Sequence, residues 1–117
     1  MTINSKQKGK RGELEVAELL RSHGFEARRG QQFQGGPGSP DVVHSIPGVH
    51  IEVKRVETFN AYKALGQAVE DRNEWETPVV FHRRKREPWV VVLFADDYLN
   101  LLNELKMAKR GANREKC

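Results

Sequence analysis

A chain of 117 residues can form one domain with a single core but not two. Its 38% hydrophobic and 31% charged residues exclude a disordered chain, and no apolar run approaches the roughly 20 residues that span a bilayer. A net charge of +4 favours an anionic partner, and the single cysteine, Cys117, excludes an internal disulfide and fits a cytoplasmic protein of bacterial, archaeal or phage origin.

Periodicity and turn signals predict a helix, three strands, a second helix, two strands and a final helix within one domain, residues 1–117. The predicted ranges are 8–23, 25–29, 41–46, 49–56, 60–75, 78–82 and 89–94, followed by a helix capped by Asp96 or Asp97 and carrying Leu99, Leu102 and Leu105. Residues 30–39 are glycine-rich and predict a loop. Residues 90–93 lack alternation, which predicts a strand covered on both faces. Flexible ends are expected before about residue 8 and after about 111.

The strands 41–46 and 49–56 are predicted to form a hairpin around Pro47-Gly48. A turn centred there places Asp41 directly opposite Lys54 and diagonally opposite Glu52. Residues two apart in a strand share a face, so Glu52 and Lys54 emerge together while their apolar neighbours point into the core. Glu13 lies on the apolar stripe of the first helix, which is unusual for a carboxylate without a partner.

Three carboxylates near a lysine are suited to chemistry on phosphate. The carboxylates can hold a hard divalent cation, magnesium or manganese rather than zinc, and the lysine can stabilise or generate the attacking oxygen. A Glu-x-Lys motif alone is weak evidence, because Glu104-Leu105-Lys106 repeats it in a helical context. Only at Asp41 to Lys54 do a preceding Pro-Asp strand and a helical glutamate accompany it.

Lysine and arginine gather in four clusters around a mildly acidic middle segment. The clusters contain Lys6, Lys8, Lys10 and Arg11; Arg28 and Arg29; Arg83, Arg84, Lys85 and Arg86; and Lys106, Lys109, Arg110, Arg114 and Lys116. Any one such cluster is usually a solubilising surface. Four of them in a short chain favour contact with a phosphate backbone.

Four segments resemble a known superfamily, the PD-(D/E)XK nucleases, and within it the archaeal-type Holliday junction resolvases and their small phage relatives. The segments are Gly9-Lys10-Arg11-Gly12-Glu13, Arg28-Arg29 before the loop, Ser39-Pro40-Asp41 and Ile51-Glu52-Val53-Lys54. The resemblance runs from about residue 9 to 82. It implies a restriction-endonuclease-like αβββαβ core, an α/β fold with a mixed central sheet flanked by helices, and a magnesium-dependent endonuclease that acts as a homodimer.

Residue roles follow from the same resemblance. Metal ligands are expected at Glu13, Asp41, Glu52 and the carbonyl of Val53, with Mn²⁺ substituting for Mg²⁺. Lys54 is expected to act on the attacking water or the phosphorane, and Gln67 to bond the water or a phosphate oxygen unless it is an ordinary surface residue. DNA contacts are expected at Lys8, Lys10, Arg11, Arg28, Arg29, Gln31 and Phe33. Phe33 could equally pack on the domain, and Gly30-Gln31-Gln32 stands where such resolvases often carry a serine-glycine pair, so no serine role transfers.

The leading hypothesis is therefore a structure-selective endonuclease that makes paired cuts at four-way DNA junctions. Two alternatives remain open on the residues alone. One is a general or nicking nuclease of the virus-type replication-repair class, which would cut a linear duplex as well. The other is a catalytically silent nucleic-acid-binding protein, against which the intact set of three acids and a lysine argues.

Overall fold

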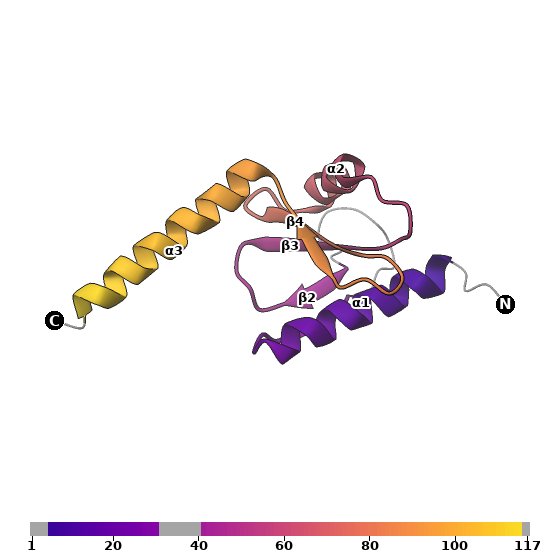
Figure 1. Cartoon of the computed structure of the whole chain (residues 1–117), viewed down its shortest axis with the longest axis horizontal. Helices are drawn as coiled ribbons and strands as arrows, with labels where there is room; N and C mark the ends of the chain where they lie inside the picture. The colour runs from indigo at the N-terminus through magenta and orange to yellow at the C-terminus, as the bar shows by residue number, and fades with distance from the viewer. Residues whose placement is uncertain (1–4, 31–40, 116–117) are drawn as a thin grey trace.

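The computed structural model describes residues 5–30 and 41–115, with side chains described except at 5, 6, 8 and 113–115. The elements occur in the predicted order αβββαββα (Figure 1). They are α1 (Ser5–Ser22), β1 (Ala27–Arg29), β2 (Val42–His44), β3 (Val49–Arg55), α2 (Ala61–Asp71), β4 (Thr77–Arg83), β5 (Val90–Val92) and α3 (Ala95–Glu115). The predicted loop 30–39, beyond Gly30, lies outside the described residues.

The central sheet has the strand order β3-β4-β5, with β3 and β4 parallel and β4 and β5 antiparallel. Two parallel neighbours need a long crossover, and α2 supplies it between β3 and β4. β1 and β2 form a separate antiparallel pair that joins Ala27 to His44 and Arg29 to Val42. The sheet is therefore mixed and flanked by helices, as the family resemblance implies.

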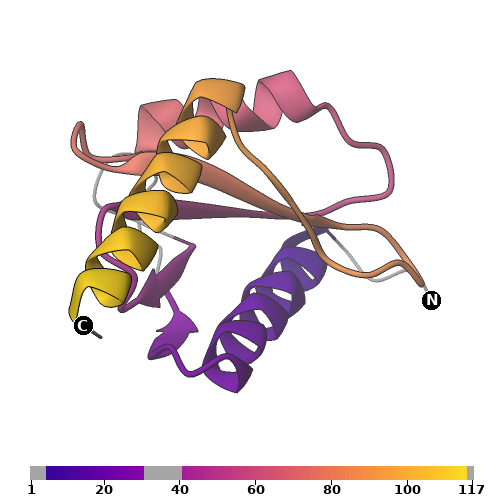
Figure 2. The same ribbon diagram turned by 60° about the vertical axis from the view of Figure 1, so that its left-hand side comes forward.

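Two apolar clusters hold α1 and α2 on opposite sides of β3 and β4 (Figure 2). The α1 cluster consists of Val16, Ala17, Leu20, Val42, Ile51 and Val53, and the α2 cluster of Ala64, Leu65, Ala68 and Val80. Both faces of β3 are covered, because Ile51 is 1% exposed and its neighbour Glu52 is 3% exposed. His50 and Glu52 on this strand are therefore desolvated, whereas Lys54 and Arg55 are only partly buried.

The predicted β2–β3 hairpin is wrong. β2 pairs with β1 and β3 pairs with β4, so no ladder places Asp41 opposite Lys54. The predicted turn itself forms, since Gly48 has φ of +71°, a conformation that glycine adopts readily after proline. Its carbonyl accepts a hydrogen bond from the N–H of Thr77 on β4, which ties the turn to the sheet rather than to β2.

Helix boundaries also differ from the predicted ones. α1 begins at Ser5, so Glu13 lies in the middle of the helix instead of near its start. α2 ends at Asp71 because Arg72 turns to an extended conformation and closes the helix on the carbonyl of Ala68. Asn60 caps its start by accepting a hydrogen bond from the N–H of Lys63, 3.0 Å away.

The C-terminal part differs most from expectation. α3 projects from the body, and the molecule measures 62 × 28 × 25 Å (Figure 1). Its leucines at 99, 102 and 105 are exposed, and the helix continues past Gly111 to Glu115. Asp96 and Asp97 lie inside the first turn, where acids favour the helix dipole, rather than at the cap. Val90 and Val91 are each 48% exposed, so β5 is an open edge strand and not one covered on both faces.

Gly12 sets how closely α1 approaches β3. A Cβ at this position would lie 2.8 Å from the Cβ of Arg55 and 3.4 Å from Cγ1 of Val53. The Cβ of Arg55 is fixed to the backbone, so it cannot move aside without shifting the strand. The absent side chain of Gly12 thus lets the next residue, Glu13, approach the strand that carries Glu52.

Gly12→Ala is expected to lower the free energy of unfolding by about 1–3 kcal/mol through overpacking, despite the better helix propensity of alanine. Urea denaturation followed by circular dichroism measures this change. Gly9→Ala is the matched control, because nothing lies within 4 Å of its Cβ position and helix propensity should raise stability by up to about 1 kcal/mol. Equal stability of the two variants would show that the close approach does not constrain the fold.

Candidate active site

Asp41 lies immediately before β2 and contacts the edge of β3 that faces away from β4. Its Oδ2 accepts a hydrogen bond from the backbone N–H of Val53 at 2.8 Å, and its side chain is buried. The N–H of Gly30 bonds the carbonyl of Asp41 at 2.9 Å, which extends the β1–β2 pairing by one step. Asp41 is therefore held next to the Glu52–Lys54 strand, as predicted, by a side-chain bond instead of a ladder.

Glu13 reaches the same region from α1. Its Oε2 accepts a hydrogen bond from Nε of Arg29 at 3.0 Å, and its side chain is 13% exposed. Burial raises the pKa of Glu13, the negative charge of Asp41 raises it further, and the cation of Arg29 opposes both. The charge of Glu52 also raises this pKa, so Glu13 lies within electrostatic range of both other acids.

Glu52 is buried beside His50, a residue that the sequence motifs do not identify. Nε2 of His50 donates a hydrogen bond to Oε2 of Glu52 at 3.3 Å, and both side chains are 3–4% exposed. Burial raises the pKa of Glu52, the His50 bond opposes this, and the charge of Asp41 adds to it. Burial lowers the pKa of His50, but the hydrogen bond and charge of Glu52 outweigh it, so the net pKa is raised. The shared strand face of residues 50 and 52 was the only sequence signal for this pair.

Lys54 points from β3 towards α2. Its Nζ donates a hydrogen bond to Oε1 of Gln67 at 2.7 Å, so the structure brings Gln67 to the site. The contact differs from the predicted one, because Gln67 orients the ammonium of Lys54 here. A lysine fixed by one bond keeps two further N–H donors for a phosphate or a water molecule.

The predicted metal ligands are neighbours but do not converge. Within the described residues, no group of three or more His, Cys, Asp or Glu side chains is close enough to hold a metal ion. Glu13 is turned to Arg29, Asp41 to the N–H of Val53, and Glu52 to His50. The donor set still fits a hard cation, because the charge of Asp41 raises the pKa of both Glu13 and Glu52, and a divalent charge would offset that repulsion.

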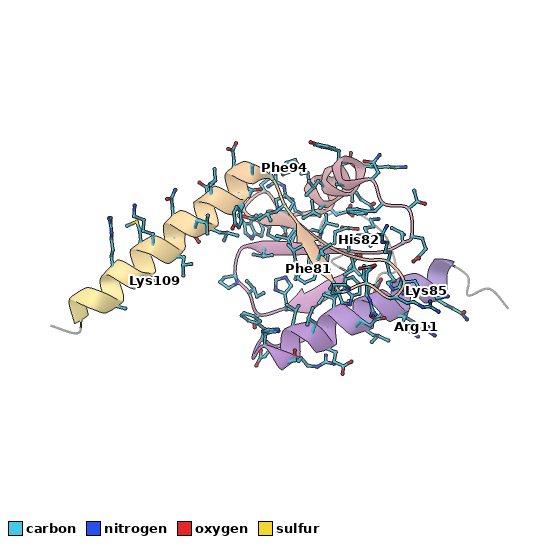
Figure 3. The ribbon with its side chains drawn as sticks, in the orientation of Figure 1. Arg11, Phe81, His82, Lys85, Phe94 and Lys109 are labelled. Atoms are coloured by element: carbon cyan, nitrogen blue, oxygen red, sulfur yellow. The ribbon has the colours of Figure 1, made fainter. Side chains whose placement is uncertain are left out.

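The predicted DNA contacts divide into three groups. Lys10, Arg11 and Arg28 are exposed, as a phosphate contact requires, whereas Arg29 is engaged with Glu13. The side chain of Lys8 and the residues Gln31 and Phe33 lie outside the described part of the chain. The basic turn between β4 and β5 lies against α1, because Arg83 and Trp89 both donate hydrogen bonds to Glu15. Arg11 and Lys85 accordingly occupy the same end of the molecule (Figure 3).

The mixed sheet with its two flanking helices is the restriction-endonuclease-like fold of the PD-(D/E)XK class. Residues 4–115 match the family described as archaeal Holliday junction resolvase (Hjc), and the chain belongs to that family. Among solved structures, Hjc of Archaeoglobus fulgidus, a Holliday junction resolvase from an archaeal hyperthermophile, superposes with a TM-score of 0.51. The identity is 22%, over 71% of this chain and 74% of that one, which supports the shared fold.

No curated protein sequence matches the chain. No helix among residues 5–30 and 41–115 is long and apolar enough to cross a membrane. The family assignment makes the chain a structure-selective DNA endonuclease that resolves junctions, with a role in DNA recombination and repair.

Proposed function

We propose that the chain makes paired phosphodiester cuts at four-way DNA junctions in a Mg²⁺-dependent reaction centred on the outer edge of β3. The observation that carries the proposal is the gathering of Glu13, Asp41 and Glu52 within electrostatic range of one another beside Lys54. The net pKa of Glu13 and of Glu52 stays raised although Arg29 and His50 oppose the rise, so a bound cation would relieve the repulsion that remains. The retention of these acids at this edge therefore supports a metal-binding role, and a DNA substrate supports a cytoplasmic location.

Glu13, Asp41, Glu52 and the carbonyl of Val53 would hold the ion. When bound, Mg²⁺ polarises the scissile phosphate and lowers the pKa of a water molecule. Asp41 is kept in place by the N–H of Val53, which fixes its carboxylate at the outer edge of β3. Lys54, oriented by Gln67, offsets negative charge that grows on the phosphate in the transition state. Arg29 and His50 hold Glu13 and Glu52 in the absence of the ion.

Paired cuts require two active sites, and the exposed part of α3 supports a homodimer. Tyr98, Leu101, Leu102 and Leu105 are 41–51% exposed and recur at the i, i+3, i+4, i+7 spacing of one helix face. We call these four residues the α3 stripe. A stripe of this kind, on a helix that projects from its own domain, is suited to packing on a second copy. The two-fold symmetry of a dimer then matches the approximate two-fold symmetry of a junction.

The test is cleavage of a labelled immobile four-way junction and a linear duplex of the same sequence, with Mg²⁺ and with EDTA. Symmetric cuts on the junction are expected with Mg²⁺, and none on either substrate with EDTA. Cleavage that persists in EDTA would refute the metal dependence. Equal cutting of both substrates would identify a general nuclease of the replication-repair class, and junction binding without cutting would identify a silent binder.

A further inference from the structure

A small pocket adjoins the candidate site on the α2 side. Its volume is about 220 Å³, below the roughly 300–1,000 Å³ of typical small-molecule sites. It is lined by Lys54, Val56, Thr58, Phe59, Asn60, Lys63, Ala64 and Gln67. The hydrogen-bonded pair Lys54 and Gln67 forms part of its wall, so the pocket and the candidate site share the same ammonium group.

The lining has a cationic wall and an apolar floor. Lys63 and Gln67 lie four residues apart on α2 and hence on one side of that helix. Lys63 is exposed, and within the part of the chain that the structure describes its ammonium makes no ion pair, whereas Lys54 already bonds Gln67. The floor is rigid, because the ring of Phe59 stacks on that of His82 with centroids 3.9 Å apart and 8° between the planes.

This combination selects one kind of ligand. Two ammonium groups, a threonine hydroxyl and an amide can bind an anionic oxygen, and the flat Phe59 ring can support a sugar or a base. No acidic side chain lines the pocket, so nothing in it repels a phosphate. The donors are flexible and not arranged in a planar fork, which suits binding of a phosphate rather than reading of a base edge.

We infer that this pocket binds the phosphate adjacent to the scissile one, with Lys63 as its principal contact. The inference rests on the proposed active site in one respect only, namely that the scissile phosphate lies at Lys54. A DNA strand that passes Lys54 enters the pocket directly, because the same side chain borders both. Lys63 thus acts as a positioning residue that holds the register of the strand.

The experiment measures junction binding in EDTA, so that cleavage plays no part in the readout. Wild type and Lys63→Gln are each titrated with junctions that carry one uncharged methylphosphonate at successive positions around the cut. Wild type should lose about fivefold in affinity at the phosphate next to the cut, and Lys63→Gln should lose about as much on unmodified DNA. Lys63→Gln should lose no further affinity when the phosphate next to the cut is modified, because its contact with that phosphate is already absent.

Lys106→Gln is the matched control, since it removes the same charge from α3, far from the pocket. It should retain the full loss at the adjacent phosphate. The inference would be overturned if, at every modified position, the affinity loss from Lys63→Gln and the loss from the methylphosphonate simply added. If the two losses failed to add only at a phosphate several positions from the cut, the pocket would not bind the phosphate next to the scissile one.

Failure of the active-site proposal would be seen in a separate cleavage assay, in which the Asp41→Asn variant would still cut the junction. The binding experiment is unaffected by that result, because it contains no metal and measures no cut. The two proposals can therefore fail separately.

Discussion

Asp41→Asn should abolish junction cleavage, by at least about a thousandfold, while junction binding is retained. Asparagine is isosteric and its carbonyl can still accept the N–H of Val53, so the contact that fixes the side chain is preserved. The lost charge removes a predicted metal ligand. Because the charge of Asp41 raises the pKa of both Glu13 and Glu52, its removal also relieves repulsion and should leave the melting temperature unchanged or higher.

Single-turnover cleavage with Mg²⁺, junction titration in EDTA and thermal unfolding together test this prediction. Asp96→Asn on the exposed first turn of α3 is the matched control and should cleave like wild type. Cleavage by Asp41→Asn within tenfold of wild type would remove Asp41 from the active site. A large fall in melting temperature would instead assign Asp41 a structural role.

Leu102→Arg combined with Leu105→Arg should weaken the proposed dimer by about a hundredfold or more, because two charges would be buried at the interface without partners. Sedimentation measures the change in mass, and junction cleavage should shift from paired cuts to single nicks. The hydrolytic site on β3 is untouched, so nicking activity should persist.

Asn103→Arg on the opposite side of α3 is the control, since it adds a positive charge outside the α3 stripe. Its mass and its paired cleavage should match those of wild type. A monomeric wild type that still makes paired cuts would contradict the dimer proposal. Equal dissociation by both variants would show that charge anywhere on α3, rather than the α3 stripe, is what matters.

Local physics made most of the elements predictable. The apolar spacing of α1 predicts a stripe of Leu14, Val16, Ala17, Leu19 and Leu20. Val16, Ala17 and Leu20 are buried in the core, because a helix must bury such a stripe, whereas Leu14 is 49% exposed. Asn60 does start α2, where its side chain satisfies a free N–H group. The proximity of Asp41 to the Glu52–Lys54 strand is also confirmed, although its cause is a side-chain bond.

Pairing between distant strands could not be predicted in the same way. The short turn at Pro47-Gly48 made a hairpin the simplest reading, yet β3 pairs with β4 across the whole of α2. Whether β3 pairs with the nearby β2 or the distant β4 depends on how α1 and α2 pack on the strands. The periodicity of apolar residues does not describe this packing. The His50–Glu52 pair was missed for a related reason. Alternation predicts a shared face for residues 50 and 52, but the cover over that face comes from α2.

The sequence pattern cannot distinguish an apolar segment that its own chain buries from one that a second copy of the chain would bury. The leucines of α3 and the valines of β5 predict that these segments are covered, whereas both are exposed in the single chain. Hydrophobic periodicity predicts only that a surface is removed from water, not which molecule covers it. Which molecule supplies the cover is a property of the assembly.

The parallel pairing of β3 with β4 has a consequence for how the enzyme matures. The strand that carries Glu52 and Lys54 has no partner nearby in sequence, and its ladder closes only after α2 and β4 have been synthesised. Non-local pairings of this kind form late in folding, because the intervening chain must first be ordered. The ladder that fixes this strand can therefore form only when the chain as far as Arg83 is available.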